Sequence, residues 1–284
     1  MPFVNGSSSA TELTGAGLKW FFRVGPTDAS FAETMFGLLS QQARGGKKVS
    51  RIAILHTNDT YGNGVESVTK AAAMKAGYQV VADIAYDKTA NDLTPEILPI
   101  KSARPDVLFD SSYTSDAILL MRGLRSLNWY PNALLAYGAG FSDPTFLPTL
   151  GQLASGAMSR AAWSAQIPKP STQAVAKLFQ QKYQRPMTEN SARGFSSVMA
   201  LAMAISNAKS TDPAAVRAAL EKLNIPGDEL IEPWTSIQFD GSHQNTGAQG
   251  IVAQVQGGKY QLVYPANYAV AKVVWPLTQA STGK

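Results

Sequence analysis

The sequence predicts an α/β protein whose parallel sheets are covered by helices on both faces. Two observations support this fold class. Strand-like and helix-like patterns alternate between residues 28 and 138, and the loops that join them are short. Neighbouring parallel strands need a crossover connection of this kind, which is usually a helix, and the resulting sheet is buried on both sides.

The alternating series begins with a helix that opens near Asp28. Its residues Phe31, Met35, Leu38 and Leu39 follow the spacing of one apolar helix face. The remaining elements of the series alternate along the chain. Strands are expected at 51–56, 78–86, 106–110 and 132–138, and helices are expected to contain 65–72 and 117–124 and to span 93–103.

The pattern changes after about residue 165, where the Pro-rich segment "IPKPST" crosses from one part of the chain to the next. Helices are expected at 172–184, 190–208 and 212–223, and strands at 235–239, 250–256 and 259–264. Asp212 is the expected N-cap of the third helix, with Pro213 in its first position. Gly257 and Gly258 predict a hairpin turn between the last two strands.

The three helices between residues 172 and 223 need a sheet to cover, and the sequence supplies no series of strands for it. Residues 1–22 contribute at most one strand, "PFV", and a short helix around 10–15. We therefore expect the second half of the chain to belong to a domain whose beginning is missing.

Composition excludes several classes of function. Cysteine is absent, which rules out disulfides, thiolate catalysis and Cys-ligated metals. The densest basic group, Arg44, Lys47, Lys48 and Arg51, is too small for a nucleic-acid footprint, so no nucleic-acid partner is expected. No apolar run approaches the roughly 20 residues of a membrane span. The opening "MPFVNGSSSATELTG" does not read as a signal peptide.

A nucleotide site receives little support from the glycines after the strand at 51–56. Gly62, Gly64 and Ser67, with Asp83 about twenty residues on, superficially match a dinucleotide fingerprint. However, "HTNDTY" intervenes where a tight turn is required. Asp83 also falls inside its expected strand rather than at the end, so neither a nucleotide nor another cofactor is predicted.

Catalysis is also poorly supported. His56 and His243 are far apart in the sequence, so they do not suggest a metal cluster, and His56 is expected to be a satisfied polar group at a strand end. Asp59 and Asp110 each end a strand. They could form a carboxylate pair, or they could serve in helix capping and loop hydrogen bonding, which is the favoured interpretation.

A binding site is better supported, because two successive strands end in polar loops that carry a tyrosine. These loops are "HTNDTYG", with Tyr61, and "FDSSYTSD", with Tyr113. Ligands of parallel α/β sheets dock beyond the carboxyl ends of the strands, and a tyrosine offers both a flat apolar face and a hydroxyl. The alternative is that both rings only pack at the sheet edge.

Two long stretches resemble the periplasmic branched-chain amino-acid (Leu/Ile/Val) binding protein family. They are "RIAILHTNDTYGNG…AGYQVVADIAYDKTANDLTPEILPIKSARPDVLFDSSYTSDAILLMRGLRSLNW" and "GAGFSDPTFLPTLGQLASGAMSRAAWS". The segment "PFVNGSSSATELTGAGLKWFFRVGPTD" is similar to the family segment that leaves the first lobe and enters the second. The resemblance covers essentially the whole chain, but the family's signal peptide and roughly its first three βα units have no counterpart.

This resemblance implies the two-lobe type I periplasmic binding fold of ABC importers, with parallel sheets flanked by helices and an incomplete first lobe. Lobe one would comprise residues 1–22 and 165–240, and lobe two would comprise 23–164 and 241–284. Family members close their two lobes around one solute by hinge bending.

The resemblance also implies the site residues. The serine-rich loop "GSSSATELT" corresponds to the lobe-one loop that holds the charged head of an amino acid, with Ser7 and Ser9 as contacts. Tyr61 and Tyr113 would line lobe two. Two positions depart from the family pattern, because Ala139 replaces a carboxylate that binds ammonium and Arg193 replaces a pocket aromatic.

We therefore expect a non-catalytic, periplasmic solute-binding protein whose partners are a small amino acid or carboxylate and the membrane permease of an ABC transporter. Because Ala139 cannot neutralise an ammonium group, either Asp59 or Asp110 must do so or the ligand has none. With Arg193 as a carboxylate partner, an organic acid without an α-amino group, aromatic in view of the two tyrosines, should bind at least as well as leucine or valine. A ligand-sensing protein of the same fold and an α/β enzyme using Asp59 or Asp110 are the alternatives.

Overall fold

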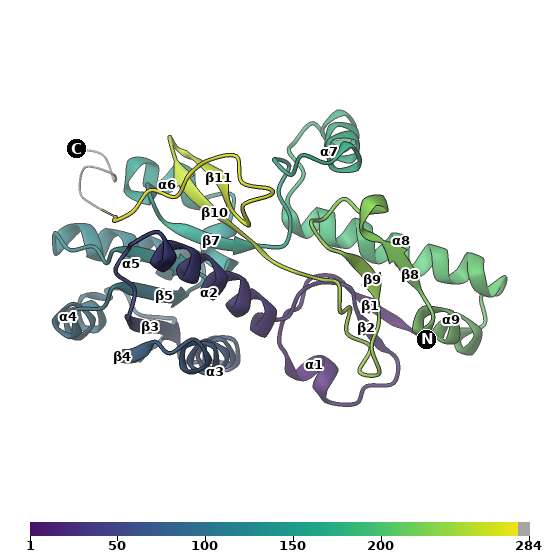
Figure 1. Cartoon of the computed structure of the whole chain (residues 1–284), viewed down its shortest axis with the longest axis horizontal. Helices are drawn as coiled ribbons and strands as arrows, with labels where there is room; N and C mark the ends of the chain where they lie inside the picture. Colours follow the sequence, from purple (N-terminus) through teal and green to yellow (C-terminus); the bar gives the residue numbers. More distant parts are fainter. Residues whose placement is uncertain (278–284) are drawn as a thin grey trace. The chain divides into compact units, whose positions relative to one another are not determined.

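The computed structural model describes residues 1–277 and divides the chain into two compact units. Unit 1 consists of residues 1–30 and 162–251, and unit 2 consists of residues 31–161 and 252–284. The α/β class predicted from the sequence is confirmed, with a mostly parallel sheet flanked by helices in unit 2 (Figure 1). No helix among residues 1–277 is both long enough and apolar enough to cross a membrane.

Unit 2 is built around a seven-stranded sheet of order β11-β10-β7-β6-β5-β3-β4. The strands from β3 to β7 that pair in this order are parallel, whereas β10 and β11 form an antiparallel hairpin. The strands are β3 (Arg51–Thr57), β4 (Gln79–Tyr86), β5 (Val107–Ser111), β6 (Ala133–Ala136), β7 (Met158–Ala161), β10 (Ile251–Gln256) and β11 (Lys259–Tyr264). Every residue of β5 is buried, as expected for a parallel strand covered on both faces.

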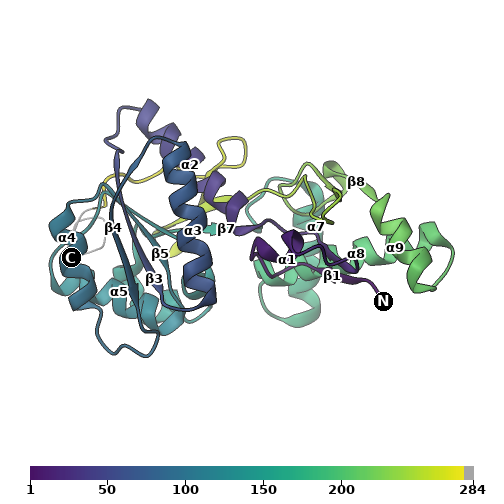
Figure 2. The ribbon, with the colours of Figure 1, turned by 90° about the horizontal axis from the view of Figure 1, so that it is seen from below.

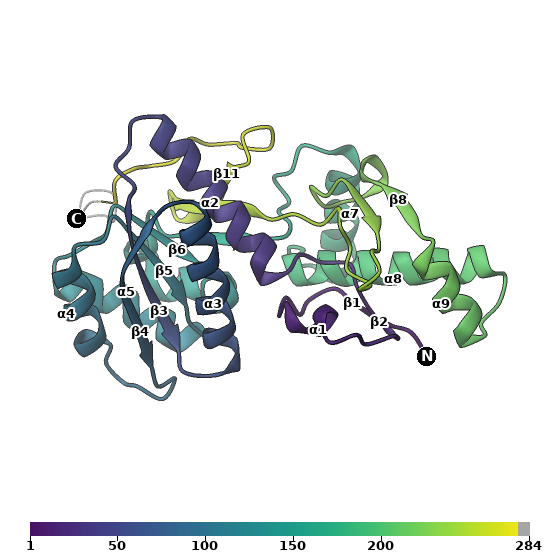
Figure 3. The ribbon, with the colours of Figure 1, turned by 60° about the horizontal axis from the view of Figure 1, so that its bottom comes forward.

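Helices cover both faces of this sheet (Figures 2 and 3). They are α2 (Asp28–Arg44), α3 (Thr60–Lys75), α4 (Thr94–Ala103), α5 (Thr114–Ser126), η1 (Ala139–Ser142), α6 (Phe146–Leu150) and η2 (Gly151–Ala154). On one face, Leu108 packs in a single apolar core with residues of α4, α5 and α6. On the other face, Phe36 of α2 stacks on Phe109 of β5, with ring centroids 5.0 Å apart.

Unit 1 has two small sheets and three long helices. Strands β1 and β2 form a parallel pair, and β8 and β9 form an antiparallel pair. The elements are β1 (Phe3–Asn5), α1 (Glu12–Gly15), β2 (Phe21–Arg23), α7 (Pro170–Tyr183), α8 (Glu189–Ala208), α9 (Pro213–Glu221), β8 (Asn224–Pro226), η3 (Gly227–Glu229) and β9 (Ser236–Gln238). Asp212 caps α9 by accepting the amide hydrogens of Ala214 and Ala215, which confirms the predicted cap.

The chain leaves one unit for the other at points that differ from those read in the sequence. The crossings follow Ser30, Ala161 and Ile251, whereas the sequence places them after residues 22, 164 and 240. The first is displaced because β2 pairs with β1 and Asn245 hydrogen-bonds to the Val24 carbonyl at 2.9 Å, which keeps the segment after β2 in unit 1.

Helix α8 exposes apolar side chains on one face. Phe195, Val198 and Met199 lie at i, i+3 and i+4, and Val198 is 66% exposed. Exposed apolar faces of this kind bind hydrophobic dyes and favour self-association.

We therefore expect the purified chain to bind a dye such as 1-anilinonaphthalene-8-sulfonate, and the double substitution Val198→Gln with Met199→Gln to reduce the fluorescence at least twofold. Because Val198 is 66% and Met199 43% exposed, the melting temperature should change by less than about 3 °C, consistent with surface substitutions. A monomeric wild-type chain that binds no dye would refute the interpretation.

Candidate functional site

The tyrosine pair lies at the carboxyl edge of the unit 2 sheet. Strands β3 and β5 are parallel neighbours, so the loops that follow them leave the sheet at the same edge. Tyr61 stands in the first turn of α3, and Tyr113 is the N-cap residue of α5. Their ring centroids are 5.7 Å apart with planes tilted by 47°. The two residues singled out in the sequence are therefore brought together.

Two glycines allow the loops behind this pair to pack tightly. A Cβ on Gly62 would lie 1.9 Å from the Thr57 carbonyl oxygen, so only glycine lets α3 begin so close to the end of β3. A Cβ on Gly140 would lie 2.3 Å from the Tyr113 carbonyl oxygen. These close approaches fix the positions from which both tyrosines project.

Asp59 connects the tyrosine pair to the start of α3. Its Oδ1 accepts the Gly62 amide hydrogen at 2.9 Å and the Thr57 hydroxyl at 3.0 Å, which confirms the predicted capping role. Its Oδ2 accepts the Tyr113 hydroxyl at 3.1 Å and lies 3.9 Å from the Lys88 ammonium. Oδ1 thus caps α3, and Oδ2 binds the Tyr113 hydroxyl.

Asp59 is held in its ionised form. Partial burial works against the charge, but hydrogen bonds from Gly62, Thr57 and Tyr113, together with the nearby Lys88 ammonium, outweigh it and lower the pKa of this carboxyl. The Tyr113 hydroxyl shows the opposite effect, because burial and its bond to the Asp59 carboxylate raise its pKa. Tyr113 therefore remains a neutral donor.

Asp110 is a different kind of carboxyl. It lies fully buried at the end of β5, and its Oδ1 accepts the Ser112 hydroxyl at 2.9 Å. Its Oδ2 has no hydrogen-bond partner. Burial, with a further contribution from the Asp116 carboxylate, raises the pKa of Asp110 to about 8. The solvated carboxylate pair that Asp59 and Asp110 could have formed is therefore not present, because only Asp59 reaches the surface.

Ala139 begins η1 with a positive φ of 44° and presents only a methyl group. Arg160 lies close to Ala139 and was not predicted from the sequence as a site residue. Its guanidinium carbon lies 4.0 Å from the centroid of the Phe31 ring, and a Cβ on Gly138 would lie 2.9 Å from that carbon. Arg160 was not foreseen because "MSRA" lacks the apolar alternation of a strand, so β7 itself was not predicted.

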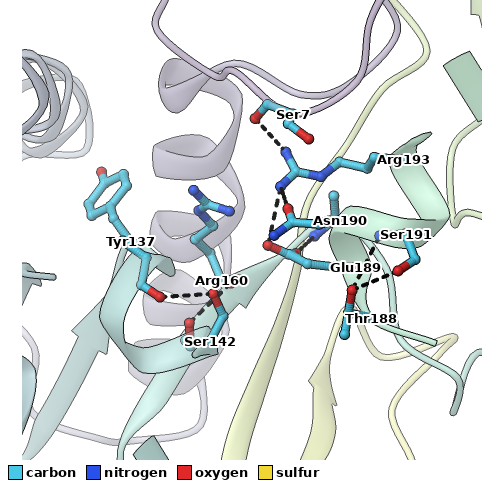
Figure 4. A network of polar contacts seen from close by, with 12 residues as sticks. Ser7, Tyr137, Ser142, Arg160, Thr188, Glu189, Asn190, Ser191 and Arg193 are labelled. Atoms are coloured by element: carbon cyan, nitrogen blue, oxygen red, sulfur yellow. Dashed lines mark hydrogen bonds and ion pairs between the residues drawn. The ribbon is translucent and has the colours of Figure 1, made fainter. Parts of the chain in front are cut away.

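The serine-rich loop of unit 1 is tied to the first turns of α8 (Figure 4). Arg193 donates from Nη1 to the Ser7 carbonyl at 2.8 Å and from Nη2 to Asn190 Oδ1 at 2.7 Å. It also pairs with Glu189 Oε1 at 3.3 Å. Ser9 accepts the Asp28 amide hydrogen through its carbonyl at 2.8 Å. Ser7 is therefore anchored to α8 through Arg193, and Ser9 is anchored to the start of α2.

Arg193 is only 4% exposed, so its side chain is buried although it lies near the start of a helix. Its hydrogen bonds to Ser7 and Asn190 and its ion pair with Glu189 lie within unit 1, and they hold the loop. The loop also packs closely, since a Cβ on Gly6 would lie 2.5 Å from the Arg193 carbonyl oxygen.

The histidines form no metal site. His56 has Nδ1 3.1 Å from the Thr57 carbonyl and Nε2 3.4 Å from Asp83 Oδ1, which confirms it as a satisfied polar group. His243 stacks on Phe22 with centroids 4.2 Å apart. Across residues 1–277, no group of three or more His, Cys, Asp or Glu side chains could hold a metal ion.

Comparison with known proteins identifies relatives over nearly the whole chain. A family model described as "Periplasmic binding protein" matches residues 1–259. The Leu/Ile/Val-binding protein homolog 8 of Brucella abortus is 25% identical over 282 residues, covering 96% of this chain and 70% of that protein.

Two solved structures share the fold. An ABC transporter substrate-binding protein from Desulfitobacterium hafniense, in complex with Leu, has a TM-score of 0.76 at 23% identity. The match covers 93% of this chain and 73% of that protein. An ABC transporter solute-binding protein from R. palustris, in complex with benzoate, has a TM-score of 0.76 at 17% identity. The match covers 95% of this chain and 72% of that protein.

Proposed function

The chain belongs to the periplasmic binding protein family, and from that premise we propose that it is the substrate-binding protein of an ABC uptake system. Its substrate is a small amino acid or an organic acid. Relatives named for leucine, isoleucine and valine, and a fold neighbour that holds benzoate, support this range of ligands.

The observation that carries the proposal is the tyrosine pair with Asp59 at the carboxyl edge of the unit 2 sheet. Tyr113 is 40% exposed although it is large and partly apolar. Its hydroxyl is fixed by Asp59, and its ring lies beside that of Tyr61. A rigid aromatic surface with one anchored polar group suits a small amphipathic ligand.

In unit 1, the serine-rich loop supplies the second set of contacts in this proposal. Ser7 and Ser9 would offer hydroxyl and backbone groups to the charged head of the ligand, and Arg193 would hold the loop in place through the Ser7 carbonyl. The proposed location is the periplasm, and the proposed partner is the membrane permease that receives the solute. Binding without turnover is the proposed activity.

We expect Tyr61→Ala and Tyr113→Ala each to weaken ligand binding by about 1–3 kcal/mol, the usual cost of losing an aromatic contact in a binding site. Isothermal titration calorimetry with the best ligand from a thermal-shift screen of amino acids and carboxylic acids measures this loss. The melting temperature should fall much less than it does for a core residue.

The matched control is Tyr183→Ala, because Tyr183 is an exposed tyrosine at the end of α7 in unit 1. Its replacement should leave affinity unchanged. Unchanged affinity in both site variants, with a large loss of melting temperature, would favour packing at the sheet edge instead. Turnover of a bound compound that disappears in Asp59→Ala would favour an enzyme, and ligand-dependent control of an attached or partner protein would favour a sensor.

A further inference from the structure

We propose that Asp59 is the residue that recognises a ligand ammonium group, in place of the carboxylate that position 139 lacks. This inference rests on the proposed function and names the substrate class of that same site. Its consequence is that the ligand carries an amino group, whereas the sequence alone favoured an acid without one.

The first step concerns which carboxyl group is available. An ammonium removed from water needs an anionic partner, because an unpaired buried charge is very costly. Asp110 cannot fill this role, since it is enclosed in the sheet and bonded to Ser112. Asp59 can, because its side chain is 21% exposed and stands at the open edge of the sheet beside Tyr113.

The second step concerns the hydrogen-bond capacity of Asp59. Its Oδ1 is occupied by the Gly62 amide and the Thr57 hydroxyl. Its Oδ2 receives one hydrogen bond, from Tyr113, and the Lys88 ammonium stands at 3.9 Å, beyond hydrogen-bond distance. A carboxylate offers about four acceptor positions. Oδ2 therefore has room for one further donor, and the exposed Lys88 ammonium is a competitor for it.

The third step concerns Arg193, on which the expectation of an amine-free acid partly rested. Its guanidinium binds the Ser7 carbonyl, Asn190 and Glu189, so a role in holding the loop accounts for its presence at this position. The positive charge of Arg193 consequently does not indicate whether the ligand is an anion or carries an ammonium group. The two neighbouring rings of Tyr61 and Tyr113, one of which is bonded to Asp59 through its hydroxyl, are also of a type that attracts cations through cation–π interactions.

The test compares amino acids with their 2-oxo acids, which differ only in the amino group. Leucine, valine and phenylalanine, each paired with its 2-oxo acid, are titrated calorimetrically into the 284-residue chain. We expect at least one amino acid to bind at least tenfold more tightly than its 2-oxo acid. In Asp59→Asn, which retains an oxygen to cap α3, this preference should fall at least tenfold with little change in melting temperature.

Two further variants sharpen the result. Lys88→Gln should tighten amino-acid binding about two- to fivefold, because it removes a competing cation, whereas an anionic ligand held by Lys88 would bind more weakly. Asp212→Asn is the matched control, since Asp212 is likewise an N-cap carboxylate but lies in unit 1, and it should leave the preference unchanged.

Equal binding of amino acids and 2-oxo acids, or an unaltered preference in Asp59→Asn, would overturn this inference while leaving the proposed function intact. If the wild-type chain binds neither set, nor any compound of the thermal-shift screen, the proposed function fails and this inference fails with it.

Discussion

Replacing Arg193 with alanine should lower the free energy of unfolding by about 3–5 kcal/mol, as expected when one partner of a buried ion pair is removed. The variant leaves the Glu189 carboxylate, whose side chain is 10% exposed, without this partner, and it removes the donor that holds the Ser7 carbonyl. Chemical denaturation followed by circular dichroism measures the loss. Ligand affinity should fall as well, because the serine-rich loop loses its anchor.

The chain contains a matched control for this experiment. Arg217 and Glu221 form an arginine–glutamate pair with the same i, i+4 spacing at 2.7 Å, and Arg217 also donates to a backbone carbonyl. That pair is 30% and 38% exposed, so Arg217→Ala should cost less than about 1 kcal/mol. Similar losses in both variants would mean that burial of Arg193 does not govern the energetics.

The central elements of unit 2 were predictable because their signals are local. Residues 51–56 and 106–110 are apolar runs, and the helices after them carry apolar residues at helical spacing. The segment "MSRA" has no such signal, since β7 becomes a strand only by pairing with its neighbours β6 and β10. Likewise, β2 is recognisable only from its partner β1. Strands that form only by pairing with distant segments cannot be predicted from local sequence patterns.

The site was predictable only in part, for a related reason. The tyrosines after β3 and β5 could be placed together because parallel neighbours end at one edge. The different burial and pKa shifts of Asp59 and Asp110 could not be predicted, because in the sequence each residue simply follows or ends a strand. Only the structure shows that one faces solvent with several donors around it while the other is enclosed with a single hydroxyl.

Asp110 makes the chain less stable as the pH rises. Its pKa in the folded protein is about 8 because burial disfavours the charged form, whereas an unfolded aspartate has a pKa near 4. The folded state therefore binds one more proton than the unfolded state between these two values. The stabilisation is complete below about pH 4 and is lost as the pH approaches 8, with a slope of about 1.4 kcal/mol per pH unit.

We expect Asp110→Asn to remove this slope, because an amide of the same shape cannot ionise and can still accept the Ser112 hydroxyl. The free energy of unfolding of the variant relative to wild type should rise by about 1.4 kcal/mol per pH unit between pH 5 and 8 and then level off. Urea denaturation at each pH measures it. Comparison with wild type cancels the similar effect of Glu232, whose pKa burial raises to about 7.

Asp106→Asn is the opposing control. Hydrogen bonds from Arg51 and Ser50 outweigh burial and lower the pKa of Asp106, so this variant should lose stability relative to wild type as the pH rises from 3 to 5. A difference between Asp110→Asn and wild type that stays constant from pH 5 to 9 would show that Asp110 is already ionised in the folded protein.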